Sequence, residues 1–323
     1  MTTAAIVAAG LTKRYGDTVA VDSLDLSIAR GEFYGLLGPN GAGKTTAVHM
    51  LSTLIRPTSG EASIAGHSVL EAPVRVRGAV GVVFQEPALD MTLSAAENLR
   101  FAGLLNDMRA SLIRTRTSQL LELFGLAEAR DRRAGSLSGG MRRALDIARG
   151  LMHEPEVLFL DEPTIGLDVG NRRAIWRHLA ALRAQMGITI VLTTHYLEEA
   201  ESCDRVGFID HGCLVREGIP ARLVAEMGEY VVEIEASQPQ LLAQALEARF
   251  GGVAIEGNLL TFRLDDDPAR AARLQAEFGA QVRALRWRRP NLNDVFLHVV
   301  RGEGVRGGAA PRNGARAIDE AHA

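Results

Sequence analysis

The sequence predicts an α/β fold in which short buried strands alternate with helices, followed by a smaller α+β unit. The apolar runs at residues 33–37 and 157–160 are typical of strands that a parallel sheet buries on both faces. Stretches with helical spacing of apolar residues, such as 172–184, separate these runs. Beyond residue 229 the pattern becomes strand, helix, strand, strand, helix, strand, which is the βαββαβ order of a ferredoxin-like unit.

A glycine-rich loop lies between the predicted strand at 33–37 and a predicted helix at 47–54. The strand–loop–helix order and the spacing G-x-x-x-x-G-K-[ST] define a P-loop, whose backbone N–H groups surround phosphates. We therefore expect a nucleoside triphosphate here, with Lys44 on the β- and γ-phosphates and Thr45 on a phosphate-bound Mg²⁺. The loop consists of Gly38, Pro39, Asn40, Gly41, Ala42, Gly43, Lys44, Thr45 and Thr46.

Lysine is rare in this chain, which strengthens the P-loop interpretation. Two of the 36 basic residues are lysines, Lys13 and Lys44, and the others are arginines. A lysine at position 44 in so arginine-rich a chain indicates a place where a compact ammonium group fits and a guanidinium does not.

The composition limits the class of protein. Hydrophobic content of 47% and charged content of 23% are those of an ordinary soluble globular protein. A net charge of −3 argues against a nucleic-acid-binding face. The two cysteines, Cys203 and Cys213, form neither a disulfide framework nor a zinc pattern, so we expect a cytoplasmic location. No apolar run approaches the roughly 18 residues of a membrane-spanning helix, so another chain must do any crossing.

The segments on either side of the loop add two candidate ligands. Strands are expected at 5–11 and 19–28, and Tyr15 in the turn between them could stack on a base or be an ordinary amphipathic surface residue. A core strand expected at 78–84 ends at Gln85, which either caps the strand or brings a neutral amide to Mg²⁺ and a water. Apolar residues at helical spacing between 92 and 134 predict a helical insertion.

A second phosphate-binding helix start is predicted at Ser138, Gly139 and Gly140. A hydroxyl and two glycines precede a helix expected at 141–152, and the N–H groups at such a start attract anions. An N-cap serine before a flexible glycine pair explains the local structure equally well. It does not explain why one chain has two predicted phosphate-binding sites.

Further polar side chains follow the predicted strands. Asp161 could hold Mg²⁺ and Glu162 could act as general base, although adjacent acids are also common at a solvated strand end. Asp168 lies in the next loop. A strand expected at 188–193 leads to His195, which could bond the γ-phosphate or be structural.

As an ordered set, these motifs resemble the nucleotide-binding subunit of ABC transporters over residues 5 to about 228. The resemblance makes Leu137 to Met141 the signature sequence, with Met141 and Val169 at positions where the family commonly has Gln and Pro. It implies that Glu162, His195 and Gln85 are catalytic and that Thr45, Gln85 and Asp161 hold Mg²⁺. The residues implied to contact ATP are Tyr15, the loop at 38–46, Ser138, Gly139, Gly140 and Asp168.

The family resemblance also implies a domain organisation. Residues 1–228 would be the ATPase domain, a P-loop NTPase core of ABC type with an antiparallel β subdomain and a helical subdomain at about 86–150. Residues 229–302 would be a small α+β domain with Trp287 in its core, and 303–323 a disordered tail. The sequence around Ser138, Asp161 and His195, and the terminal motif at 290–297, resembles the exporter branch of daunorubicin-resistance and nodulation-factor ATPases.

The implied function is ATP hydrolysis that drives transport. Two copies would pack head to tail, so that Ser138 to Gly140 of one copy contact the ATP held by Lys44 of the other. A separate membrane permease would hold the chain at the inner face of the cell membrane, against residues 86–93. The cargo would be drug-like, a lipid or a glycan, and import is not excluded.

Two other classes of protein fit less well, namely soluble ABC-type ATPases of chromosome maintenance or translation, and P-loop kinases. Chromosome-maintenance ATPases insert a long coiled coil where only 94 residues separate Lys44 from Ser138, and translation factors carry two ATPase units. A P-loop kinase would leave the signature unexplained.

Overall fold

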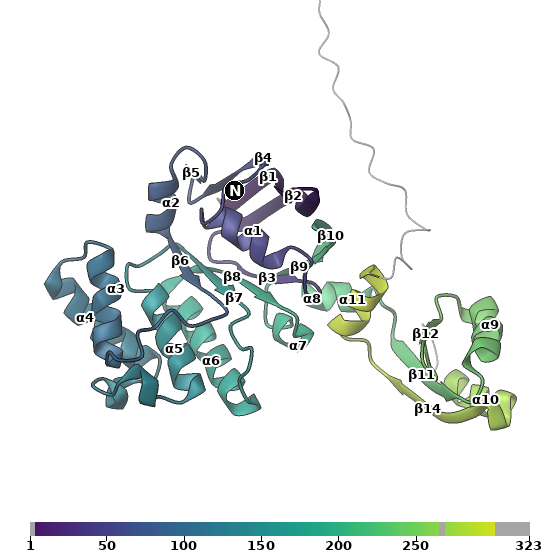
Figure 1. Ribbon diagram of the computed structural model, residues 1–323. Helices are drawn as coiled ribbons and strands as arrows, with labels where there is room; N and C mark the ends of the chain where they lie inside the picture. The colour runs from purple at the N-terminus through teal and green to yellow at the C-terminus, as the bar shows by residue number, and fades with distance from the viewer. Residues whose placement is uncertain (1–3, 265–268, 301–323) are drawn as a thin grey trace, which may run out of the picture.

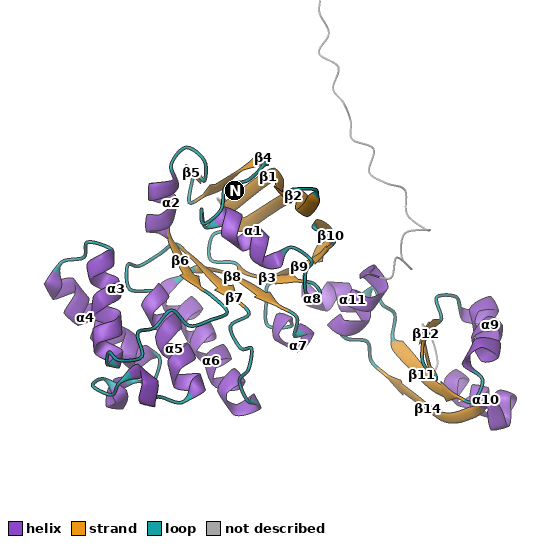
Figure 2. Ribbon diagram, viewed as in Figure 1, coloured by secondary structure: helices purple, strands orange, loops and turns teal. Residues whose placement is uncertain are grey.

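The computed structural model describes residues 4–264 and 269–300, which form a mixed α/β core and a smaller α+β unit beside it (Figure 1). The predicted α/β class is confirmed. Figure 2 shows the strands of the core between groups of helices. Within the described residues, no helix combines the length and apolar composition needed to cross a bilayer. The tail predicted at 303–323 lies outside this part of the chain.

A six-stranded sheet forms the centre of the core. The order across the sheet is β10-β9-β3-β8-β7-β6, and all strands except the edge strand β10 run parallel to one another. Because parallel strands end at one edge, the loops after β3, β6, β7 and β8 meet there. The strands are β3 (Phe33–Leu37), β6 (Val80–Val83), β7 (Val157–Asp161), β8 (Thr189–Thr194), β9 (Arg205–Asp210) and β10 (Cys213–Gly218).

Helices and a second sheet cover the two faces of the central sheet. Helix α1 (Lys44–Leu51) lies on one face, and α5 (Gly139–Gly150) and α6 (Val169–Met186) lie on the other (Figure 1). Alternate residues of β7 point to opposite faces, so Phe159 packs in the cluster with α1 and Leu160 in the cluster with α5. Burial of β7 on both sides explains its uninterrupted apolar sequence.

An antiparallel sheet of order β2-β1-β4-β5 packs over α1. The predicted strands at 5–11 and 19–28 are confirmed but longer, because both continue to the turn at Gly16 and Asp17. Val21, Leu24 and Ile28 are fully buried in the cluster shared with α1. The elements are β1 (Ala4–Tyr15), β2 (Thr18–Ala29), β4 (Ser59–Ile64) and β5 (His67–Ser68).

The strand predicted at 78–84 is shorter than expected. Gly78 belongs to helix α2 (Pro73–Ala79), which begins with proline at its first position, where the missing N–H costs nothing. At the other end Phe84 has left the sheet, and its carbonyl accepts a hydrogen bond from Arg143 instead. Only β6 remains as strand.

The predicted helical insertion is confirmed. It contains α3 (Ala95–Leu105) and α4 (Ala110–Leu123), with short 3₁₀ turns at Ala127–Ala129 and Ala134–Ser136. Ser94 and Glu97 form a reciprocal capping box that fixes the start of α3. Helices α1 and α5 begin earlier than predicted, at Lys44 and Gly139, because Gly43 and Ser138 are their N-cap residues.

The C-terminal unit has its own sheet of order β12-β13-β11-β14. This is the antiparallel ferredoxin-like order predicted from the βαββαβ pattern, and a cluster that includes Leu246, Phe262 and Leu274 packs it. The elements are β11 (Tyr230–Ala236), α9 (Pro239–Phe250), β12 (Ala254–Glu256), β13 (Leu259–Leu264), α10 (Ala269–Phe278), a 3₁₀ turn at Gly279–Gln281, and β14 (Val282–Arg288).

The prediction that Trp287 lies in the core is wrong. Its side chain is 44% exposed. Trp287 pairs with Val232 across the sheet, but β14 is an edge strand and Trp287 lies near its end. The apolar cluster under the helices includes Leu285 and does not extend to Trp287.

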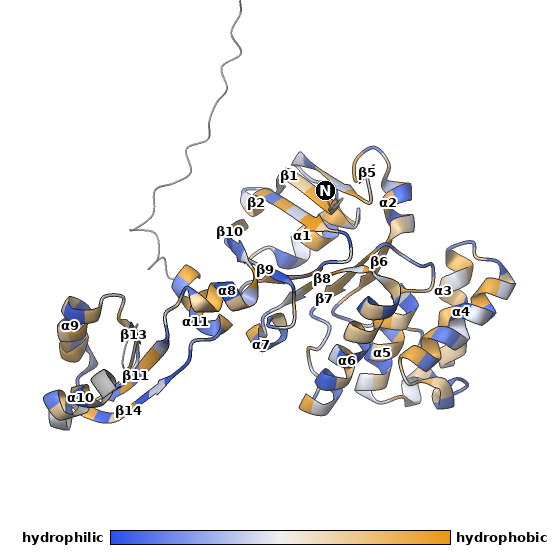
Figure 3. Ribbon diagram, turned by 180° about the vertical axis from the view of Figure 1, so that it is seen from behind, coloured by the Kyte–Doolittle hydropathy of each residue, from blue (hydrophilic) through white to orange (hydrophobic). Residues whose placement is uncertain are grey.

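Three short helices pack together where the C-terminal unit meets the core. They are α7 (Leu197–Ala200), α8 (Pro220–Ala225) and α11 (Leu292–Val300). After β14 the chain returns to the core as α11, which contacts α7, α8, β9 and β10. Figure 3 shows α11 as a mainly hydrophobic element at this junction.

Candidate functional site

The glycine-rich loop runs from β3 to the start of α1 and is closely packed from behind. A Cβ atom on Gly38 would lie 2.2 Å from the Ile209 carbonyl oxygen, and one on Gly43 would lie 2.4 Å from the Ala20 carbonyl oxygen. Gly43 also has a φ of 106°, which side chains rarely adopt. Glycine at these positions therefore lets the backbone bend with its amides turned toward one cavity.

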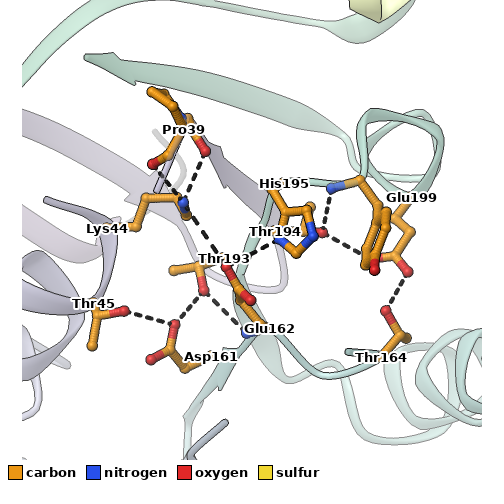
Figure 4. A network of polar contacts seen from close by, with 12 residues as sticks. Pro39, Lys44, Thr45, Asp161, Glu162, Thr164, Thr193, Thr194, His195 and Glu199 are labelled. Atoms are coloured by element: carbon orange, nitrogen blue, oxygen red, sulfur yellow. Dashed lines mark hydrogen bonds and ion pairs between the residues drawn. The ribbon is translucent and has the colours of Figure 1, made fainter. Parts of the chain in front are cut away.

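Lys44 lies in this loop's interior, with its side chain 5% exposed. Its Nζ donates to the carbonyl oxygens of Gly38, at 2.8 Å, and Pro39, at 3.0 Å, and lies 4.0 Å from Glu162 Oε1 (Figure 4). Burial lowers the pKa of Lys44, while the negative charges of Glu162 and Asp161 oppose that shift. The two loop carbonyls and the Glu162 carboxylate therefore hold the ammonium at the edge of the cavity.

Thr45 and Asp161, both predicted Mg²⁺ ligands, are adjacent. Thr45 Oγ1 donates to Asp161 Oδ1 at 3.2 Å, and Thr193 Oγ1 donates to the same oxygen (Figure 4). Asp161 is 4% exposed at the end of β7. Among the described residues, no three His, Cys, Asp or Glu side chains come together as a metal site. The Thr45 hydroxyl and the Asp161 carboxylate are oxygen donors of the kind that suit Mg²⁺, which binds through one or two carboxylates and substrate phosphates.

Glu162 and His195 face each other at the ends of β7 and β8. His195 Nδ1 lies 3.2 Å from Glu162 Oε1. Glu162 has a φ of 46°, and its backbone N–H donates to the carbonyl and to Oγ1 of Thr193, both at 3.1 Å. A non-glycine residue in this conformation is strained and stays there only when its surroundings fix it. This backbone conformation places the Glu162 carboxylate beside Lys44 and His195.

Gln85 completes one side of the same cavity, two residues after β6. The cavity has a volume of about 440 Å³, within the range of nucleotide-sized ligand sites. Gly38, Pro39 and Asp161 adjoin it through the contacts of Lys44 and Thr45. Its lining residues are Ala20, Asn40, Gly41, Ala42, Gly43, Lys44, Thr45, Thr46, Gln85, Glu162, Ile165 and His195.

Tyr15 does not line this cavity. It is 51% exposed at the end of β1, and Lys13 Nζ lies 5.2 Å from its ring centroid. The structure therefore does not place Tyr15 among the residues that line the cavity.

The second predicted phosphate site also lies away from the cavity. Ser138 caps α5 by accepting from the Met141 N–H at 3.3 Å, and a Cβ on Gly140 would lie 2.1 Å from Asn171 Oδ1. Asp168 caps α6 and accepts from the Asn171 N–H at 2.9 Å, and these bonds lower the pKa of Asp168. Asn171 therefore brings Gly140 and Asp168 together, but neither they nor Ser138 and Gly139 line the cavity around Lys44.

Arg143 is a functional position that sequence reasoning missed. It is 4% exposed in α5, and its guanidinium donates to the carbonyl oxygens of Phe84, Asp161, Glu162 and Pro163. These carbonyls belong to the segments that carry Gln85 and the two acids, so one side chain ties the segments to α5. In a chain so rich in arginine, nothing in the sequence distinguished Arg143.

Two other missed residues are Thr193 and Glu199. Thr193 contacts both acids, as described above, and a hydroxyl within a fully buried strand was the signal that could have identified it. Glu199 binds the hydroxyls of Thr164 and Thr194, and its partners come from distant parts of the sequence.

Comparison with known proteins identifies relatives of nearly full length. A family model described as ABC transporter matches residues 21–165. The chain is 41% identical over 306 residues to the daunorubicin resistance ATP-binding protein DrrA3 of Streptomyces coeruleorubidus, covering 93% of this chain and 96% of that protein. It is 42% identical over 301 residues to the Nod factor export ATP-binding protein I of Burkholderia orbicola, covering 93% and 98%.

Solved structures with the same fold include cbiO1 from Clostridium perfringens, part of the ABC transporter complex cbiONQ. It has a TM-score of 0.65 and 27% identity, covering 76% of this chain and 95% of that one. A dimeric ATP-binding cassette in a post-hydrolysis state, bound to ADP and Pi, has a TM-score of 0.60 and 28% identity, covering 66% and 98%. Identity of 41% and 42% over 93% of the chain, together with the match of the family model, places the chain in the ABC transporter family, as one of its ATP-hydrolysing subunits.

Proposed function

We propose that this subunit powers export of a drug-like, lipid or glycan compound through a separate permease. One observation carries the direction of transport: two relatives similar over 93% of this chain have names that refer to daunorubicin resistance and to Nod factor export. The similarity includes most of the C-terminal unit, so it is not limited to the nucleotide site that all such ATPases need.

The geometry supports a division of roles within the site. The loop amides and Lys44 bind the phosphates of ATP. Thr45, Asp161 and Gln85 would hold Mg²⁺, which would neutralise phosphate charge. Glu162 orients the attacking water and accepts its proton, and His195 keeps the Glu162 carboxylate in place through the 3.2 Å contact. Tyr15 is retained as a candidate contact for the base.

The site is completed by a second copy of the chain. Ser138, Gly139, Gly140 and Asp168 cluster away from the cavity in one copy, so they serve as its outer wall only if another copy supplies them. The dimeric cassette among the similar structures supports this arrangement. Each ATP then lies between the loop of one copy and α5 of the other, and its hydrolysis lets the copies separate.

The permease holds the subunit at the inner face of the cell membrane. The segment from Gln85 to Leu93 is its proposed contact, because Gln85, Glu86, Pro87 and Ala88 are all exposed directly beside the cavity. A helix of the permease seated there would contact the chain beside Gln85 and so sense ATP.

Purification from membranes tests the proposal. The tagged chain, extracted with a mild detergent, should bring down an integral-membrane protein. The pair reconstituted in vesicles should hydrolyse ATP faster in the presence of the transported compound. The variant Glu86→Arg tests the contact itself. It reverses a charge on the proposed surface and should release the partner without weakening ATP binding. Recovery of no membrane protein, together with ATPase activity that is independent of membranes, contradicts the proposal.

A further inference from the structure

Glu199 binds two threonines that flank the catalytic pair. It lies on α7, which begins two residues after His195, and it is 8% exposed. One carboxylate oxygen accepts from Thr164 Oγ1, and the other accepts from Thr194 Oγ1 at 3.0 Å (Figure 4). Thr194 precedes His195 in the chain, and Thr164 follows Glu162 by two residues. Glu199 therefore links the two loops that carry the catalytic groups.

This arrangement is poorly explained by stability alone. Burying a carboxylate is costly unless a cation or several hydrogen bonds compensate. The described residues provide Glu199 with two hydroxyl donors and no ion pair. An apolar side chain would fill the same space at lower cost, so the carboxylate is better explained by the position it gives its partners. Glu162, with its strained φ of 46°, needs such support.

The C-terminal unit reaches α7 from the other side through α11. Helix α11 contacts α7, and Leu292 and Val295 are buried in the same apolar cluster as Ala200 of α7. Phe296 also packs on Phe208 of the central sheet, with ring centroids 6.0 Å apart. Figures 1 and 3 show α11 between the core and the C-terminal sheet. The place of α7 thus depends on that of α11.

Arg288 ties α11 to the C-terminal sheet. From β14 it makes two bonds to Asp294 on α11, at 2.7 and 2.8 Å, and its Nε bonds Glu233 on β11 at 2.9 Å. Such paired charge-assisted bonds fix orientation as well as distance. Asp294 is 6% exposed, so water competes little at the carboxylate, although the Arg288 side chain is 35% exposed. A movement of the C-terminal sheet is therefore transmitted to α11.

We propose that Glu199 is a positioning residue through which the C-terminal unit sets the rate of ATP hydrolysis. The inference rests on the proposed catalytic role of Glu162 and His195. Helix α11 holds α7, and Glu199 on α7 holds the loops of Glu162 and His195 at the spacing that hydrolysis needs. ATP binding depends on the loop around Lys44 on the other side of the cavity, so it does not change with α7.

Thr164→Val tests the first part in the full-length chain. It keeps the side-chain shape and removes one hydroxyl donor, so kcat should fall about tenfold or more while the Kd for ATP stays within about twofold. Thr164→Ser restores the donor and should restore kcat. Glu199→Gln should lower kcat in the same way, and Glu198→Gln, the same chemical change on the exposed side of α7, is its matched control. A structural role alone would lower the melting temperature and ATP affinity together.

Arg288→Gln tests the connection to the C-terminal unit, with the exposed Arg289→Gln as its matched control. We expect Arg288→Gln to lower kcat severalfold at unchanged ATP affinity, and the double variant with Thr164→Val to be no slower than Thr164→Val alone, since both act through α7. Parental kcat in Thr164→Val overturns the role of Glu199, and a multiplicative double variant overturns the coupling. A parental chain that hydrolyses no ATP would contradict the catalytic roles proposed for Glu162 and His195. The results for Thr164→Val and for the double variant do not bear on those two roles.

Discussion

Glu162→Gln should bind ATP with parental affinity and hydrolyse it about a thousandfold more slowly, within the range expected on removal of a general base. The substitution is nearly isosteric and leaves Lys44, Thr45 and Asp161 unchanged, so the phosphate and metal contacts persist. An amide cannot accept the proton of the attacking water. Phosphate release measures the rate, and fluorescence of a labelled nucleotide measures the binding.

The control for this variant is Glu201→Gln, an exposed glutamate shortly after α7 that undergoes the same chemical change. It should hydrolyse ATP at the parental rate. Hydrolysis by Glu162→Gln at that rate would show that another group takes the proton, and the nearest alternative is His195, 3.2 Å from the Glu162 carboxylate.

Lys44→Ala should weaken ATP binding by about a hundredfold, because it removes a desolvated cation from its phosphate partner. The ammonium is buried between the Gly38 and Pro39 carbonyls and faces the cavity. No other lysine is near enough to replace it, since Lys13 bonds the Arg56 carbonyl on the antiparallel sheet. Isothermal titration with ATP and Mg²⁺ measures the change.

Two variants that keep the charge refine this test. Lys44→Arg should also lose binding, because the larger guanidinium does not fit between two carbonyls 2.8 and 3.0 Å from Nζ. Lys13→Arg makes the same change at an exposed site and should have no effect on binding. If Lys44→Arg bound ATP normally, positive charge alone, rather than the shape of the ammonium, would explain the lysine at position 44.

The sequence predicted the parts of the fold that follow from regular patterns. The uninterrupted apolar run of β7 indicated a strand buried on both faces, and parallel strands necessarily bring their carboxyl ends together, so Asp161, Glu162 and His195 could be placed at one edge. The alternating pattern and turns after residue 229 predicted β11 to β14 in ferredoxin-like order. Trp287 was misplaced because alternation gives the face of a strand and not its distance from the covering helices.

The rest depends on contacts between distant segments. The hydrogen bonds of Arg143 to four carbonyls and of Glu199 to Thr164 arise only when α5, β7 and α7 are assembled. The φ of 46° at Glu162 likewise has no local sequence signal, since nothing short of the complete site favours a left-handed glutamate. Residue types could be predicted, and the contacts that position them could not.

The head-to-tail sharing of each ATP is tested most directly by mixing two inactive variants, Lys44→Ala and Ser138→Arg. In a mixed dimer one site carries both defects and the other carries neither, provided that the loop of one copy meets α5 of the other. A one-to-one mixture should then recover about a quarter of the parental ATPase rate if the sites act independently, while each variant alone stays inactive. A mixture as inactive as its components would contradict the sharing of each ATP between two copies.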